Sequence, residues 1–326
     1  MACKQPNNMA SFAKKGIIGL AALVLIGHVM SLGARAEVRV SYLYTLSNFY
    51  GPIPYNWVNL SYDGPRQELY VVDARERDIR VFNDNGMETF RFGDDGSLGG
   101  VVDAVVEKDG RILVLVRKSQ KTAILVCNFR GELESELVID GLPPEFAGFA
   151  PERLIYRQGR LYLLDATAMR IAVTDDDGRF QQGYDLGALV GVEDDRRGVT
   201  RIGGFSLDPQ GNLLFTIPVR FAAYKLTPDG QLTGFGMPGS APGRFGVVAG
   251  IVVDDLGYYY VADRLKSAVI VFDKDLRFQT EFGFRGFKAD NLMGPNNLTL
   301  DAEGRLYVSQ LRGRGVSVFK IDHDTP

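Results

Sequence analysis

The sequence predicts an all-β protein. Three observations support this: a unit that repeats along the chain, short strand patterns inside each unit, and turn residues between the strands. Each unit has a second strand of the form Leu-Tyr-Val-x-Asp, as at 69–73, and a third strand ending Val-Phe-Asp, as at 271–273. The second strands end at 73, 117, 165, 217, 263 and 310, with spacings of 44, 48, 52, 46 and 47 residues. Four short strands in every ~45 residues are typical of a β-propeller blade. We therefore predict a six-bladed β-propeller with four-stranded blades.

Each element of the unit has its own sequence signal. An apolar first strand and a Gly-containing turn precede the second strand, which ends in Asp in units one, three and five, at Asp73, Asp165 and Asp263. Units two and four carry Arg117 and Ile217 at that position. A polar loop leads to the third strand, and the fourth strand ends Phe-Gly in units one, four and five. The first strands are expected to line the central channel.

The sixth unit ends after its third strand, and the missing strand is predicted at the other end of the chain. Residues 38–46 read as a strand and are followed by 48–51, Asn-Phe-Tyr-Gly, which is similar to the fourth-strand endings. We expect the N-terminal strand to complete the last blade and close the ring, because closure removes an exposed sheet edge. Two stacked sandwiches are the alternative, but sandwiches do not require repeats in register.

The repeat resembles the NHL repeat, in which Asp-x-x-Gly-x-Leu-Tyr-Val-x-Asp and a polar loop precede Val-x-Val-Phe-Asp. Residues 254–263 and 301–308 match that pattern best, and the resemblance covers nearly all of 38–322. The family includes RNA-binding regulators, extracellular sensor domains, a zinc-dependent peptide lyase and exported bacterial proteins. Exported proteins similar to this one occur in metal-reducing bacteria alongside multihaem cytochromes. The resemblance therefore implies a protein partner such as a multihaem cytochrome or an envelope assembly.

The first 36 residues have the features of a secretory signal peptide. Lys14 and Lys15 precede an apolar run from Gly16 to Met30, and a small-residue motif ends at Ala36, where we predict cleavage. Residues 37–326 would then form a single propeller domain in the periplasm or at the cell surface. An uncleaved signal that anchors the chain in a membrane is the alternative.

Charge argues against a nucleic-acid partner. The chain has 37 basic and 40 acidic residues, and loss of residues 1–36 removes four basic residues and no acidic ones, leaving 33 against 40. Nucleic acid requires a concentrated basic surface instead.

The small number of Cys and His residues limits the kinds of metal, redox and catalytic site that the chain can form. Beyond the signal peptide the chain has one Cys, Cys127, and one His, His323. A single Cys excludes a disulfide within the processed chain. A single His excludes a multi-histidine metal site and argues against a Ser-His-Asp triad. Cys127 lies among apolar neighbours and is interpreted as a buried small hydrophobe.

The loops between second and third strands are rich in cations, and we call the face that carries them the top face. Arg and Lys outnumber Asp and Glu there by eleven to five, whereas the opposite turns are rich in Asp. One reading is a polarised disc that attracts an anionic partner; the other is ordinary turn chemistry. The predicted partner-binding cations are Arg75, Arg77, Arg117, Lys118, Arg170, Arg220, Arg264, Lys266, Arg312 and Arg314. Lys121 is the eleventh cation of these loops. Trp57 is added as an aromatic anchor, with a packed closure seam as its alternative role.

Six positions are predicted to line the channel: Trp57, Asp103, Glu152, Gly204, Gly250 and Asn297. Oxygen ligands from Asp103, Glu152 and Asn297 could hold Ca²⁺ or another divalent cation. In the alternative, the two acids are solvated or pair with Arg153 and Arg201.

The sequence favours an exported, non-catalytic binding or scaffold propeller over an enzyme. We expect a monomer with no cofactor and no catalytic residues that recognises a protein or other anionic macromolecule through its top-face loops. A divalent-metal-dependent hydrolase or lyase in the channel, similar to a lactonase, is the alternative function.

Overall fold

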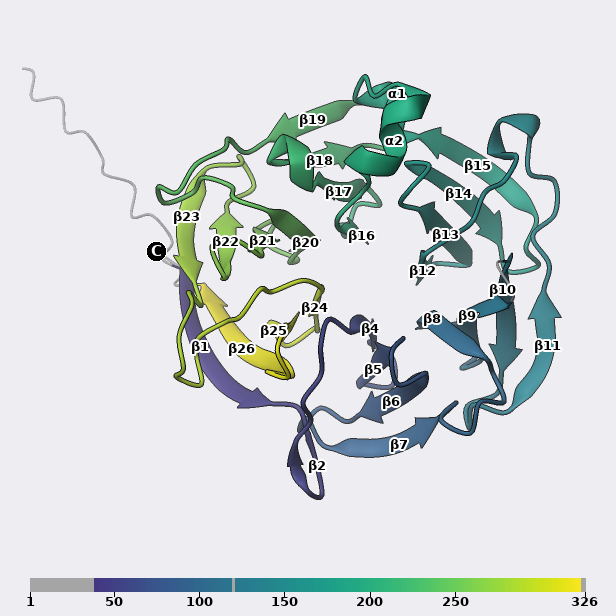
Figure 1. Ribbon diagram of the computed structural model, residues 1–326, viewed down its shortest axis with the longest axis horizontal. Helices are drawn as coiled ribbons and strands as arrows, with labels where there is room; N and C mark the ends of the chain where they lie inside the picture. Colours follow the sequence, from purple (N-terminus) through teal and green to yellow (C-terminus); the bar gives the residue numbers. More distant parts are fainter. Residues whose placement is uncertain (1–37, 119–120, 324–326) are drawn as a thin grey trace, which may run out of the picture. The chain divides into compact units, whose positions relative to one another are not determined.

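A computed structural model describes residues 38–118 and 121–323 and contains six four-stranded antiparallel blades arranged in a ring (Figure 1). The last sheet has the order β1-β26-β25-β24, in which β1 (Val38–Thr45) pairs with β26 (Val316–His323). The N-terminal strand therefore completes the sixth blade, and both the fold class and the predicted closure are confirmed. The predicted signal peptide lies outside the described residues.

The strands of each blade follow one another in chain order. Blade one holds β4 (Asn59–Asp63), β5 (Glu68–Asp73), β6 (Asp78–Phe82) and β7 (Glu88–Phe92). Blade two holds β8 (Gly100–Val106), β9 (Ile112–Lys118), β10 (Lys121–Cys127) and β11 (Leu133–Leu137). Blade three holds β12 (Arg153–Arg157), β13 (Arg160–Asp165), β14 (Arg170–Asp175) and β15 (Phe180–Asp185). Blade four holds β16 (Phe205–Leu207), β17 (Leu213–Ile217), β18 (Ala222–Leu226) and β19 (Leu232–Phe235). Blade five holds β20 (Val248–Val253), β21 (Tyr259–Asp263), β22 (Ala268–Phe272) and β23 (Phe278–Phe282). Blade six adds β24 (Leu298–Leu300) and β25 (Arg305–Ser309) to β26 and β1.

The hydrophobic core lies between neighbouring blades. Tyr70 and Ile79 of blade one pack in one cluster with Val114, Leu125 and Cys127 of blade two. Side chains of a strand alternate between the two faces of its sheet, so each blade supplies apolar side chains to both neighbours. Cys127 is fully buried, as predicted, and burial raises the pKa of its thiol to about 11.

The Asp that ends the second strand ties two loops together. The Asp263 carboxylate accepts hydrogen bonds from the backbone N–H groups of Gly246, in the crossing from the previous blade, and Leu265, in the following turn. In blade six Gln310 takes this place and accepts from the N–H of Met293 in the preceding crossing. The repeat motif is therefore a loop anchor, because its side chain satisfies backbone donors that the strands leave free.

Residues 47–52 do not form the predicted fourth-strand ending. They form a small hairpin of β2 (Ser47–Asn48) and β3 (Gly51–Pro52) beside blade one (Figure 1). Phe49 and Tyr50 at its tip are each 93% exposed. The prediction was wrong here because pairing with β26 already ends at Thr45.

The crossing from blade three to blade four contains two short helices, α1 (Leu186–Leu189) and α2 (Asp194–Thr200). Asp185 caps α1 by accepting a hydrogen bond from the N–H of Ala188 at 2.8 Å. Two 3-10 turns, η1 (Pro144–Phe146) and η2 (Pro218–Arg220), lie in other top-face loops. Within 38–118 and 121–323, no helix has the length and apolar character needed to cross a membrane.

Candidate functional site

On blades three, four and five, the top-face cations are bonded to the protein itself. Arg170 lies 3.5 Å from Asp185, and Arg220 donates to backbone carbonyls of the loop after α1. Lys266 forms an ion pair of 2.5 Å with Glu281, and both side chains are only 10% exposed. These cations hold loops in place and are not free for a partner.

Trp57 and Arg264 form part of the closure seam. The Arg264 guanidinium lies 4.6 Å from the centre of the Trp57 ring and donates to Oδ1 of Asn296. The Trp57 indole N–H donates to the Gly294 carbonyl at 2.8 Å, and the Trp57 backbone N–H donates to the Gln310 carbonyl. Burial lowers the pKa of Arg264. Trp57 thus bonds to loops of blades five and six while its side chain stays 39% exposed, and both roles, packed seam and partner anchor, stay predictions.

The remaining cations of this set behave differently. Arg77, Arg117, Lys121 and Arg312 are exposed and make no ion pair with any residue that the structure describes. Arg75 is 76% exposed and lies 3.7 Å from Glu76, and Lys118 lies 3.6 Å from Glu136. These six residues belong to blades six, one and two, which are neighbours in the ring (Figure 1).

We name the two groups of top-face cations by these contacts. The open arc consists of Arg75, Arg77, Arg117, Lys118, Lys121 and Arg312. The bonded arc consists of Arg170, Arg220, Arg264 and Lys266. Arg314 belongs to blade six but donates to the carbonyls of Lys288 and Asn291, so it resembles the bonded arc.

Turn chemistry accounts for the acids of the bottom face, the end of the ring opposite the top-face loops. Asp273, for example, accepts hydrogen bonds from the backbone N–H groups of Asp275 and Arg277. Arginines in the same turns also offset the acidic charge. The pairs are Asp109–Arg111 (2.8 Å), Asp177–Arg179 (2.8 Å), Asp275–Arg277 (3.8 Å) and Asp301–Arg305 (2.5 Å).

The two predicted channel carboxylates form ion pairs between neighbouring segments. Asp103 is 2% exposed, and its Oδ2 accepts from Nε of Arg153 and from the N–H of Leu154, both at 2.9 Å. Glu152 pairs with Arg201 at 2.7 Å. Both pairs are those that the sequence offered as the alternative to a metal site.

The other predicted channel positions also join neighbouring inner strands. The Asn297 amide lies 3.5 Å from that of Asn59, which donates in turn to the Val102 carbonyl at 2.8 Å. Gly250 donates its N–H to the Asn296 carbonyl. A Cβ on Gly204 would lie 2.2 Å from a backbone oxygen of blade five, so Gly is required there.

Together these contacts form a girdle around the top of the channel, defined by Asn59, Asp103, Glu152, Gly204, Gly250 and Asn297. Trp57 was the wrong choice for blade one, because Asn59 occupies that place. The count from the first turn began too early in blade one, because Asp63 is still the last residue of β4 and the turn follows it at 64–67. Within 38–118 and 121–323, no three His, Cys, Asp or Glu side chains cluster as metal ligands.

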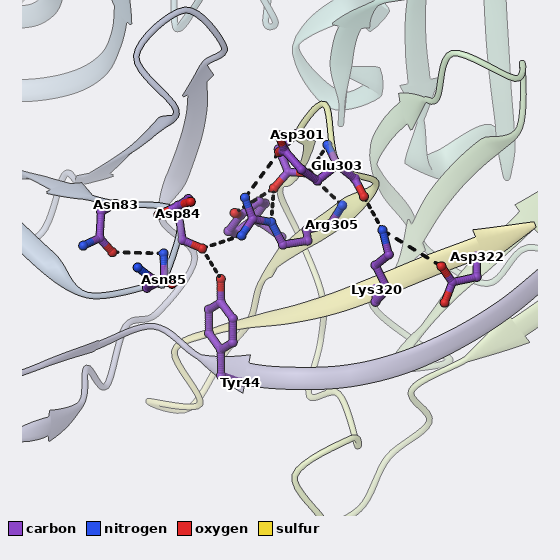
Figure 2. A network of polar contacts seen from close by, with 10 residues as sticks. Tyr44, Asn83, Asp84, Asn85, Asp301, Glu303, Arg305, Lys320 and Asp322 are labelled. Carbon is purple, nitrogen blue, oxygen red and sulfur yellow. Dashed lines mark hydrogen bonds and ion pairs between the residues drawn. The ribbon is translucent and has the colours of Figure 1, made fainter.

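Polar contacts also close the ring at the bottom face, between blades six and one. Figure 2 shows the Tyr44 hydroxyl and the Arg305 guanidinium both donating to the backbone carbonyl of Asp84. Asp301 accepts from Arg305 and, at 2.9 Å, from the Tyr307 hydroxyl. The boundary between blades six and one is therefore held by polar contacts at both ends of the channel.

Comparisons with known proteins support the fold alone. No family model matches the sequence, and no curated protein matches it. Virginiamycin B lyase from Staphylococcus aureus is 15% identical, with a TM-score of 0.52 over 87% of this chain and 99% of that one. A gluconolactonase from Xanthomonas campestris is 15% identical, with a TM-score of 0.56 over 87% and 90%. A Bacteroides thetaiotaomicron protein of unknown function is 14% identical, with a TM-score of 0.59 over 88% and 77%. The six-bladed propeller is shared, whereas the NHL assignment stays a prediction.

Proposed function

We propose that this protein is an exported, monomeric binding propeller, without catalytic activity, that holds an acidic protein partner on its open arc. The observation that carries the proposal is the gathering of six exposed cations on three neighbouring blades, of which Arg77, Arg117, Lys121 and Arg312 make no ion pair with a described residue. Cations already bonded within the protein would have to break those contacts to bind a partner. Free cations do not, and they also attract an acidic surface from a distance.

The partner is proposed by its chemistry. It presents a carboxylate-rich surface wide enough to face the loops of blades six, one and two. The N-terminal segment supports a site of action outside the cytoplasm. The resemblance to exported propellers supports an acidic envelope protein, with a multihaem cytochrome or an envelope assembly as the first candidates.

A capture experiment tests the proposal. The tagged, processed protein would be incubated with its native cell envelope at low and at high salt, and the retained proteins quantified by mass spectrometry. The open-arc variant is Arg77→Glu/Arg117→Glu/Arg312→Glu. Its matched control is Arg130→Glu/Arg160→Glu/Lys274→Glu, which makes the same charge change at exposed positions elsewhere. Loss of a salt-sensitive partner in the first variant alone is expected, whereas equal loss in both would contradict a localised site.

A further inference from the structure

The end of the first strand in blade three differs in charge from the same place in the other five blades. In those five blades a carboxylate ends the first strand or follows it directly, and it contacts a basic side chain. The pairs are Asp63–Arg66 (2.9 Å), Glu107–Arg111 (2.9 Å), Asp208–Lys225 (3.7 Å), Asp254–His323 (2.8 Å) and Asp301–Arg305 (2.5 Å). In blade three Arg157 ends β12, and Arg160 begins β13 after a turn of two residues. Two cations therefore stand where the other blades have an acid and a base.

The turn between β12 and β13 places these two arginines opposite each other. Gln158 and Gly159 have φ angles of 51° and 74°, and positive values at both central positions are typical of a two-residue type I′ hairpin turn. Arg157 and Arg160 are direct partners in the register of the two strands. Directly opposite residues project from the same face of a sheet, and like charges in such a pair are destabilising. An anion between the two guanidinium groups would remove this repulsion.

The Arg160 guanidinium is available to such an anion. Arg160 is exposed, and its side chain makes no hydrogen bond or ion pair with any residue of 38–118 or 121–323. Asp175 lies opposite Arg160 in the register of β13 and β14. The Asp175 carboxylate instead accepts hydrogen bonds from two backbone N–H groups of its own turn and from the side-chain amide of Gln181.

The Arg157 guanidinium is held in place by the first turn of blade four. Its Nη1 donates to the backbone carbonyl of Asp208, and its Nη2 donates to that of Pro209 at 2.6 Å. A guanidinium has five N–H groups, so these two bonds leave others for a further acceptor. The Asp208 carboxylate is buried and bonded to the side chains of Asn212 and Lys225. Arg157 is thus fixed by neutral carbonyls and keeps its positive charge without an ion pair among the described residues.

A pocket of about 270 Å³ lies between these arginines and the first turn of blade four. Its lining consists of Arg157, Gln158, Arg160, Tyr162, Pro209, Gln210 and Gly211. It therefore contains two cations and, among the described residues, no acid. Gln158 and Gln210 are exposed and Tyr162 is partly exposed, so their amide and hydroxyl groups can add further donors. A small pocket with two guanidinium groups and neutral donors suits an anion of a few atoms.

We propose that this pocket binds a phosphate group, either as free phosphate or as part of a small phosphorylated molecule. The phosphate oxygens accept hydrogen bonds from the Arg157 and Arg160 guanidinium groups, whose planar array of N–H donors matches phosphate geometry. A phosphate ester has a charge of about −1.5 to −2 and three acceptor oxygens, so it matches two arginines better than a single carboxylate does. The pocket lies among the bottom-face turns, and the inference does not rest on the partner site proposed for the open arc.

Four probes test the chemistry of the ligand. Isothermal titration calorimetry at about pH 8 and low salt would compare inorganic phosphate, glycerol 3-phosphate, acetate and glycerol. Both phosphates should bind about tenfold or more tightly than acetate, and glycerol should not bind. Tighter binding of glycerol 3-phosphate would support a phosphorylated molecule, and tighter or equal binding of inorganic phosphate would support free phosphate. Acetate binding as tight as phosphate binding, or no phosphate binding at millimolar concentration, would overturn the proposal.

Two variants separate a site in this pocket from general attraction to a charged surface. Arg160→Gln should weaken binding of both phosphates by about tenfold or more. Arg179→Gln makes the same charge change at an exposed position in another turn of blade three, outside the pocket, and should leave phosphate binding unchanged. Unchanged affinity in Arg160→Gln, or equal weakening in both variants, would contradict the assignment.

Thermal unfolding separates binding from a structural role of Arg160. Without phosphate, Arg160→Gln should unfold at the same temperature as the unmodified protein or a higher one, because the variant removes one of two like charges. Phosphate should raise the unfolding temperature of the unmodified protein and have a much smaller effect on the variant. A lower unfolding temperature of the variant without phosphate, together with an undiminished response to phosphate, would show that Arg160 supports the fold and not the ligand.

Discussion

The open arc and the bonded arc carry the same residue types on the same kind of loop. The side chains of the bonded arc, however, are all bonded to neighbouring parts of the protein, whereas most of those on the open arc are not. On the bonded arc, neighbouring loops and strands reach over the cations and offer acceptors, such as the Asp185 carboxylate and the Glu281 carboxylate. On the open arc, the crossing between blades one and two is short, and Arg77, in the turn after β5, and Arg117, near the end of β9, make no ion pair with the described residues. Whether a loop cation is structural or available is therefore decided by the adjacent loops, not by the cation.

The largest expected difference between the arcs is in stability. Lys266→Met removes one partner of a nearly buried ion pair and should lower the free energy of unfolding by about 3 kcal/mol. Arg117→Met, on the open arc, should change it by no more than about 0.5 kcal/mol. Urea unfolding measures both. The double variant Lys266→Met/Glu281→Leu should recover most of the loss, because no charge is left unpaired; failure to recover would mean that Lys266 acts in another way.

A smaller effect is expected at Arg220. Its guanidinium donates to the carbonyls of Val190 and Gly191, so Arg220→Ala should cost about 1 kcal/mol of unfolding free energy. Arg312→Ala serves as the exposed comparison, with an expected change near zero. Similar values for the two variants in chemical denaturation would remove the distinction between the arcs.

The smallest effect is a pH dependence on the bonded arc. Burial alone would raise the pKa of Asp185, but the N–H of Ala188 and the Arg197 guanidinium hold it below its usual value. Because the folded pKa is depressed, Asp185 contributes stability above the pKa of the unfolded chain, about 3.9, and this is lost as the pH falls through the folded pKa. Asp185→Asn should therefore lower the free energy of unfolding near neutral pH, by no more than about 1 kcal/mol because the group is partly exposed. It should also reduce the loss of stability that follows acidification. If the variant lost as much stability on acidification as the unmodified protein does, this contribution would be excluded.

The ring could be predicted because the repeat signals are local. Turn glycines, strand alternation and the unpaired final unit each constrain the blades, and they placed residues 38–46 in blade six. Two ion pairs could also be predicted, because their partners lie in adjacent inner-strand segments. These are Asp103 with Arg153 and Glu152 with Arg201.

The division of the top face could not be predicted in the same way. Arg220 and Arg314 are held by backbone carbonyls, which carry no sequence signal. Trp57 was misplaced because the count started at Asp63, which is the last residue of β4 and not part of the turn, so it missed Asn59. The shape of the channel cavity depends on how all six inner strands end, which no single repeat encodes.

The measurement that tests the central claim most directly is the salt dependence of partner binding by the open-arc variant and its matched control. The account predicts that Arg77→Glu/Arg117→Glu/Arg312→Glu weakens binding of the captured partner by about tenfold or more at low salt and reduces the salt dependence. The control Arg130→Glu/Arg160→Glu/Lys274→Glu should bind as the unmodified protein does. Unchanged binding by the open-arc variant at both salt concentrations would contradict the account.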